Sequence, residues 1–222
     1  AEGYAYQGEV SRFAGNTPRG EPSAHLPPTA FVDFIQNHDQ IGNRAFGERL
    51  LDLAEHEIVE VQTAILLLSP HVPLLFMGEE YGETRPFCFF TDFHGELADA
   101  VREGRRREFI HFAAFNGSPD ELWQIPDPNA ESTFQASKLD WAKLETEAGR
   151  TWNAFVRALL AVRHARIVPL LKGAGGNAGK VLLADDGAIA VDWTLNGGRL
   201  ELRANLSAEA RALPALTGEV IY

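Results

Sequence analysis

The sequence predicts an α/β fold with parallel strands, followed by a small antiparallel β domain. Two apolar, strand-like runs at 29–36 and 72–77 flank a helix-like run at 50–68. A strand–helix–strand order of this length implies parallel strands joined by a right-handed crossover. After residue 167, short apolar runs alternate with turn dipeptides that are typical of hairpins. The chain therefore divides into two predicted domains, 1–166 and 167–222.

The first predicted strand follows an irregular segment rich in glycine and proline, residues 1–30. The helix after it shows one apolar stripe at steps of three and four residues, formed by Ile58, Val61, Ile65 and Leu68. Ser69-Pro70 ends this helix, and the second strand begins at Val72.

The middle of the chain, residues 82–150, lacks regular periodicity and reads as a long, loop-rich segment. A second helix is expected at 151–166, where apolar residues lie on one face. Three short strands are then expected at 181–183, 189–193 and 200–203, because Asp-Gly and Asn-Gly turns separate them.

Polar side chains follow both parallel strands at the point where each strand ends. Six polar groups lie between Asn37 and Arg44, and Glu79-Glu80 follows the second strand. The carboxyl ends of parallel strands meet at one edge of a sheet, where α/β proteins keep their chemistry. The clusters therefore predict an active-site rim, although a capped strand followed by a solvated loop would give the same pattern.

Charge and composition narrow the classes of partner. The net charge of −11 disfavours binding to nucleic acid and to anionic membranes, and no apolar run is long enough to span a bilayer. The basic run at 105–107 is flanked by glutamates and reads as a solvated face with internal ion pairs. Neutral ligands such as sugars suit this charge better.

Cysteine and histidine usage gives further expectations. The single Cys88 excludes an internal disulfide framework and, with no signal peptide at the start, suggests a cytoplasmic protein. His94 and His111 have no partner at a recognisable metal-ligand spacing. We therefore expect no metal and no cofactor.

The polar cluster after the first strand resembles a motif of the α-amylase superfamily, glycoside hydrolase family 13. Residues 34–39 are similar to the aromatic-x-x-Asn-His-Asp at the end of barrel strand seven, and 73–83 are similar to strand eight. The extended stretch 36–45, together with 89–93 and 101–105, resembles the trehalose-releasing hydrolases of that superfamily. The β-rich end resembles their all-β C-terminal domain. The implied fold is thus part of a (β/α)8 TIM barrel, strands seven and eight, before a small β domain.

The resemblance implies retaining hydrolysis of the α-1,4-glucosidic bond next to the terminal trehalose of maltooligosyltrehalose. Such enzymes need a carboxylate nucleophile and a carboxylic acid, which this superfamily carries on barrel strands four and five. Asp39 corresponds to a third carboxylate, a transition-state stabiliser that binds sugar hydroxyls. His38 is expected to bind the same sugar. The alternative is a structural role, in which His38 only fixes the end of the strand.

A complete barrel takes about 250 residues, more than residues 1–166 supply. The expectation is therefore that this chain is the C-terminal portion of a longer polypeptide, with the nucleophile and acid on the remaining N-terminal part. Two strands alone would leave exposed sheet edges. By itself, the chain is expected to be inactive.

The further substrate-binding candidates could each have a purely structural role instead. Asn37, Gln40 and Arg44 belong to the same motif, and Arg44 could instead pair with Asp39 or a neighbouring carboxylate. Glu80 is expected to bind sugar or Arg44, or else to order nearby backbone. Tyr6 and Phe13 could stack on sugar rings or simply pack locally.

Two other functions remain open from the sequence. One is a glucan branching or transglycosylating enzyme of the same superfamily, which would transfer a chain and release no trehalose. The other is a non-catalytic carbohydrate-binding module whose β domain, 167–222, binds the sugar.

Overall fold

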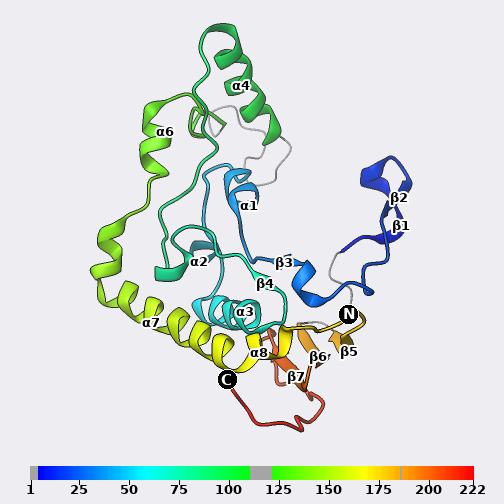
Figure 1. The fold of residues 1–222 in the computed structure, drawn as a ribbon. Coiled ribbons are helices and arrows are strands. Elements are labelled where there is room, and N and C mark those ends of the chain that lie inside the picture. Colours follow the sequence, from blue (N-terminus) through cyan, green and yellow to red (C-terminus); the bar gives the residue numbers. More distant parts are fainter. Residues whose placement is uncertain (1–4, 111–121, 186) are drawn as a thin grey trace. The chain divides into compact units, whose positions relative to one another are not determined.

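A computed structural model describes residues 5–110, 122–185 and 187–222 of the chain (Figure 1). The chain falls into two compact units. The first unit comprises the residues up to Ile35 together with Glu60–Leu74 and Phe155–Tyr222. The second comprises Gln36–Val59 and Leu75–Ala154.

The strands and helices have the following bounds. The strands are β1 (Gln7–Ser11), β2 (Thr17–Gly20), β3 (Val32–Asp33), β4 (Val72–Pro73), β5 (Gly179–Asp185), β6 (Ala188–Leu195) and β7 (Gly198–Asn205). The α-helices are α1 (His38–Gly42), α2 (Leu50–Leu53), α3 (His56–Leu68), α4 (Gly95–Glu108), α6 (Glu131–Ala136), α7 (Glu147–Val162) and α8 (Val168–Leu171).

The parallel pairing of the two predicted strands is confirmed. β3 and β4 pair in parallel, with Val32 opposite Val72 and Asp33 opposite Pro73. Both strands are shorter than predicted. The N–H groups of Val72 and Leu74 donate to the carbonyls of Phe31 and Asp33, so the ladder does not need the N–H that Pro73 lacks.

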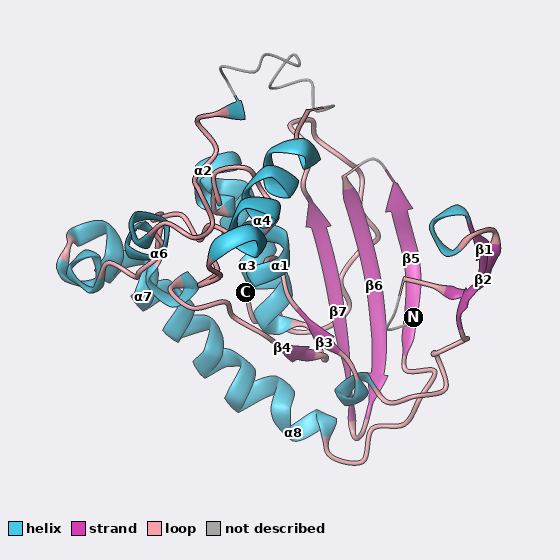
Figure 2. Cartoon of the chain, turned by 90° about the horizontal axis from the view of Figure 1, so that it is seen from above, coloured by secondary structure: helices cyan, strands magenta, loops and turns pink. Residues whose placement is uncertain are grey.

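The three C-terminal strands form an antiparallel sheet in the order β5–β6–β7, as the turn dipeptides predicted (Figure 2). Gly197 takes a φ of 79° in the second turn, a conformation that favours glycine. Val191, Trp193 and Leu195 of the central strand form a buried cluster. The predicted boundary near residue 167 stays a prediction, since residues 167–222 lie in the first unit together with earlier segments.

The two predicted helices are present with changed bounds. The run at 50–68 is two helices, α2 and α3, because the chain is extended at Ala54. The second helix, α7, begins earlier than predicted and passes into one π-helical turn, Arg163–Ile167. The buried Arg163 donates to the carbonyls of Leu67 (2.9 Å), Ser69 (2.6 Å) and His71 (2.6 Å), at and just after the C-terminal end of α3.

The prediction that 82–150 lacks regular structure is wrong for α6 and above all for α4. This 14-residue helix has few apolar residues, so the sequence offered no apolar stripe to read. Ion pairs three residues apart support it instead: Arg102–Asp99, Arg105–Glu108 and Arg106–Glu103. The expected internal ion pairs are therefore present, but the expectation of a solvated face is wrong for Arg105, which is buried.

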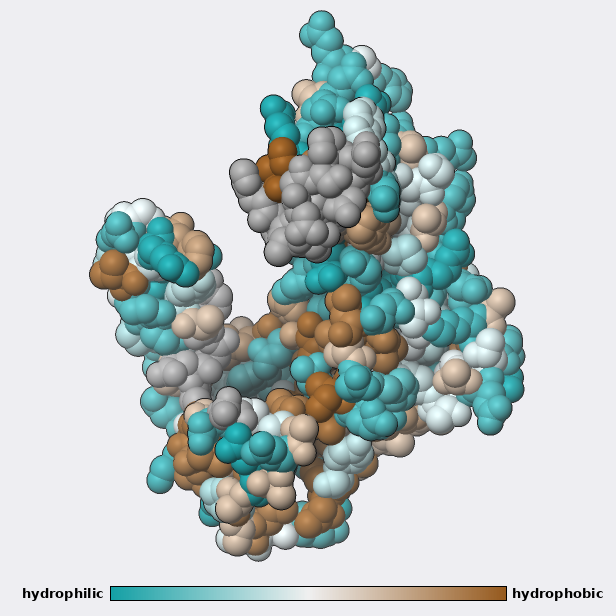
Figure 3. Space-filling view, turned by 180° about the vertical axis from the view of Figure 1, so that it is seen from behind, coloured by the Kyte–Doolittle hydropathy of each residue, from teal (hydrophilic) through white to brown (hydrophobic). Residues whose placement is uncertain are grey.

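The N-terminal segment is also more regular than predicted. β1 and β2 form an antiparallel hairpin with an irregular register between Gln7 and Val10. Val10 and Phe13 are exposed there, and apolar surface is visible on this hairpin in Figure 3. Because nearly all of the hairpin faces solvent, it shows no apolar alternation that would reveal it. In the described part of the chain, no helix combines the length and apolarity needed to cross a membrane.

Candidate functional site

The polar cluster after β3 begins with a helix cap. The Asn37 side chain accepts hydrogen bonds from the N–H groups of Asp39 (2.8 Å) and Gln40 (3.2 Å). The Gln40 side chain accepts one in return from the Asn37 N–H (2.8 Å). This reciprocal capping box satisfies free donors at the start of α1. Asn37 and Gln40 therefore fix the turn that carries His38 and Asp39.

His38 and Asp39 are the two functional groups that this cap displays. Their side chains are 70% and 73% exposed, and His38 Nε2 lies 3.6 Å from Asp39 Oδ1. An exposed carboxylate and imidazole on one short helical turn can both contact the same polar ligand. The buried Ile41 and Gly42 anchor the opposite side of the turn.

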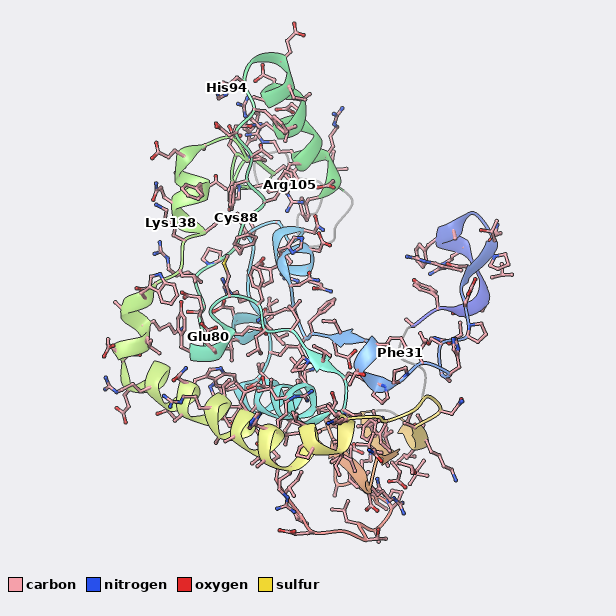
Figure 4. The ribbon with its side chains drawn as sticks, viewed as in Figure 1. Phe31, Glu80, Cys88, His94, Arg105 and Lys138 are labelled. Atoms are coloured by element: carbon pink, nitrogen blue, oxygen red, sulfur yellow. The ribbon has the colours of Figure 1, made fainter. Side chains whose placement is uncertain are left out.

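Arg44 does not pair with Asp39 in the structure but with Glu48, at 3.2 Å. Burial by itself would raise the pKa of the Glu48 carboxyl, but backbone hydrogen bonds and the Arg44 guanidinium hold that pKa below its ordinary value. Arg105 extends from α4 and donates to the carbonyls of Gly42 (2.6 Å) and Arg44 (2.7 Å), which fixes the end of α1 (Figure 4).

The turn after β4 is held by its own glutamates. Gly78 has a φ of 90°, and a Cβ there would lie 2.6 Å from the Cβ of Glu83, so glycine is required on both counts. Glu80, labelled in Figure 4, accepts a hydrogen bond from the Gly78 N–H at 3.0 Å. This is the backbone-ordering contact weighed above; a contact between Glu80 and sugar stays a prediction.

Glu83 organises the same turn from inside. Its two oxygens accept hydrogen bonds from the N–H groups of Thr84 (2.9 Å), Arg85 (2.9 Å) and Asp140 (2.6 Å) and from the Tyr81 hydroxyl (3.2 Å). Burial alone would raise the pKa of Glu83, but these donors hold it below its ordinary value. The carboxylate is therefore ionised at neutral pH and serves the fold.

Glu79 is the second buried carboxyl group of this turn. Burial raises its pKa to about 7, against the opposing effect of a hydrogen bond from the Gln36 amide. Glu79 was predicted only as part of the polar cluster after the second strand, and Gln36 was not among the predicted site residues. The available signal was a polar residue, Gln36, at the very end of an apolar run.

Tyr6 and Phe13 belong to the first unit, whereas the other six predicted site residues belong to the second. The Arg19 guanidinium lies over the Tyr6 ring, 4.0 Å from its centroid. Phe13 is 76% exposed. Local packing accounts for the contact of Tyr6, and a sugar contact of either ring stays a prediction.

Within the described ranges, no three or more His, Cys, Asp or Glu side chains are grouped so as to hold a metal ion. His94 lies at the start of α4, and His111 lies outside the described residues. The turn after β3 displays an exposed carboxylate and an exposed imidazole, those of Asp39 and His38.

Comparisons with known proteins give consistent results. The chain is 45% identical over 164 residues to a malto-oligosyltrehalose trehalohydrolase of Deinococcus radiodurans, covering 73% of this chain and 26% of the relative. It is 45% identical over 139 residues to the enzyme of the same name from Saccharolobus solfataricus, covering 62% of this chain and 22% of that relative. The chain thus spans about a quarter of the length of these relatives.

A solved structure and a family match agree with these relatives. A crystal structure of a provisionally named alpha amylase from Salmonella typhimurium is 55% identical, with a TM-score of 0.92 over 100% of this chain and 36% of that chain. Residues 176–222 match a family described as a domain of unknown function, DUF3459. These comparisons confirm the resemblance that residues 34–39 predicted.

Proposed function

We propose that this chain, which is similar over most of its length to malto-oligosyltrehalose trehalohydrolases, is the part of such an enzyme that carries its transition-state-stabilising carboxylate, Asp39. The similarity to relatives of that name is the observation that carries the proposal. The reaction is hydrolysis of the α-1,4-glucosidic bond next to the terminal trehalose of maltooligosyltrehalose. The products are trehalose and a shortened maltooligosaccharide.

Asp39 acts without attacking or protonating the substrate. A retaining glycosidase uses one carboxylate to attack the anomeric carbon and one carboxylic acid to protonate the leaving oxygen, about 5 Å apart. Asp39 binds hydroxyl groups of the sugar at the cleaved bond through its exposed oxygens. As the ring flattens and gains positive charge, a fixed carboxylate holds the transition state more tightly than the ground state.

The remaining residues divide into those that hold the turn carrying Asp39 and those that contact the sugar. Asn37 and Gln40 keep the α1 turn in place through the capping box and can lend only their remaining polar atoms to a sugar. His38 donates to a hydroxyl of the sugar that Asp39 binds. Arg44 and Glu80 can hydrogen-bond a sugar, and Tyr6 and Phe13, which belong to the first unit, are further candidates because their aromatic faces can stack on a sugar ring. The free Cys88 suits the reducing cytoplasm, where we place the enzyme.

The nucleophile and the acid come from the rest of a longer polypeptide, which the greater length of the relatives supports. The 222-residue chain alone should therefore release no trehalose from maltooligosyltrehalose, whereas the longer polypeptide should do so under the same conditions. Chromatography of the products measures this. Hydrolysis by the 222-residue chain alone would show that its own carboxylates suffice.

A further inference from the structure

Gln36 is clamped at both ends of its side-chain amide. Its Nε2 group donates to Glu79 Oε1 at 2.9 Å, and its Oε1 atom accepts from the Leu50 N–H at 3.0 Å. Gln36 and Glu79 are only 7% and 8% exposed. Gln36 is joined directly to Asn37, the cap of the turn that carries His38 and Asp39.

Glu79 is itself held in place from two sides. Its second carboxylate oxygen accepts a hydrogen bond from the Phe76 N–H. Its backbone carbonyl accepts one from Trp152 Nε1 at 2.7 Å. Both carboxylate oxygens thus meet N–H donors, and the position of Glu79 is fixed by the buried Trp152.

The two contacts of Gln36 allow one orientation of its amide. A reversed amide would place an NH₂ group against the Leu50 N–H and an oxygen against the Glu79 carboxylate. The bond to Glu79 therefore sets the direction of the whole side chain, and with it the start of the turn.

We propose that Glu79 is a positioning residue for Asp39, acting through the side-chain amide of Gln36 to hold the turn that displays His38 and Asp39. The inference rests on the proposed function of Asp39. Glu79 is buried and contacts Gln36, so it acts on the site through Gln36 and does not touch the sugar.

The charge state of Glu79 should matter, because each of its oxygens already faces a donor. Protonation places a hydrogen where no acceptor stands, so the contact with Gln36 or with Phe76 loosens. Burial raises the Glu79 pKa to about 7, so this change falls in an accessible range. The charged neighbours that act on Glu79 are Arg49, which favours the ionised form, and Glu80, which opposes it.

One further titratable group, His56, lies near Glu79 through its contact with Trp152. The centroid of the His56 ring lies 5.0 Å from that of the Trp152 indole, the ring that donates to the Glu79 carbonyl. The pH response of the Gln36 amide is therefore assigned to Glu79 with the Glu79→Gln variant, in which His56, Arg49 and Glu80 are unchanged.

Glu79→Gln in the longer polypeptide should lower kcat by on the order of 10-fold, by analogy with the lower end of the effect seen when hydrogen-bond partners of metal ligands are removed. The new amide has one oxygen for two donors, so either Gln36 or Phe76 loses its acceptor. Glu131→Gln is the matched control, because Glu131 accepts from Gln135 Nε2 at 3.3 Å on an exposed helix. It should leave kcat unchanged.

The double variant Gln36→Glu/Glu79→Gln reverses the pair and keeps every donor matched to an acceptor. The glutamine at 79 donates to the glutamate at 36 and accepts from Phe76, while the other oxygen at 36 accepts from Leu50. It should recover most of the kcat lost in Glu79→Gln, and a double variant no better than Glu79→Gln would overturn the proposal.

Nuclear magnetic resonance separates this inference from the proposed function, because it needs no turnover. The Gln36 side-chain amide signals should titrate with a midpoint near 7 in the wild type and lose that titration in Glu79→Gln, while the Glu131→Gln spectrum keeps it. Amide signals that do not respond to pH or to Glu79→Gln would overturn the inference. Absence of trehalose release by the wild type would instead overturn the proposed function.

Discussion

Asp39→Asn in the longer polypeptide is expected to lower kcat by on the order of 10²- to 10³-fold, the size found when one electrostatic stabiliser of a transition state is removed. The asparagine keeps the shape and can still accept a hydrogen bond, but it has lost the negative charge. Since the positive charge of the sugar develops mainly in the transition state, KM should change much less than kcat. Steady-state rates of trehalose release measure both parameters.

Asp185→Asn is the matched control for this variant, because Asp185 is an exposed aspartate at the end of β5, in the other compact unit. It should leave kcat and KM unchanged. A kcat of Asp39→Asn within twofold of the wild type would remove Asp39 from the mechanism. A loss confined to KM would make it a binding residue instead.

Glu83→Ala is expected to destabilise the protein by about 1–3 kcal/mol, the cost of leaving the buried Tyr81 hydroxyl without a partner, because the three N–H donors are only partly buried. The change leaves the N–H groups of Thr84, Arg85 and Asp140 and the Tyr81 hydroxyl without their acceptor. The urea midpoint of unfolding measures the effect. A destabilisation below ~1 kcal/mol would show that water replaces the carboxylate without difficulty.

Glu83→Gln separates the charge from the shape and gives the pH dependence. The folded-state pKa of Glu83 lies below its ordinary value of 4.5. The stability that the carboxylate contributes is thus fully present above that value and is lost as the pH falls through the folded-state pKa. The wild type should lose its advantage over Glu83→Gln as the pH drops below 4.5. A constant difference between the two proteins would contradict this account.

The sequence was sufficient for features with strong local signals. The parallel pairing of β3 with β4 followed from two apolar runs around one amphipathic helix, and the sheet β5–β7 followed from turn dipeptides. The polar motif at 37–44 located the turn of His38 and Asp39. In each case the individual elements carried their own signal, an apolar run, an apolar stripe or a turn motif, within a short stretch of sequence.

Features that rest on polar contacts rather than on an apolar pattern or a turn motif could not be predicted in this way. Helix α4 is supported by ion pairs rather than an apolar stripe, so its periodicity was invisible. The bond between Gln36 and Glu79 joins residues 43 positions apart, and no window of sequence contains both partners. Arg44 had several carboxylates to choose from, and the local geometry of the chain selected Glu48.

The central proposal is that this chain is part of a retaining, trehalose-releasing glycosidase, and proton magnetic resonance of the first products tests it most directly. The longer polypeptide, given maltooligosyltrehalose, should release trehalose together with a maltooligosaccharide whose new reducing end is first seen as the α-anomer. A β-anomer formed first would contradict the retaining mechanism. Chain transfer without free trehalose would contradict the proposed function itself.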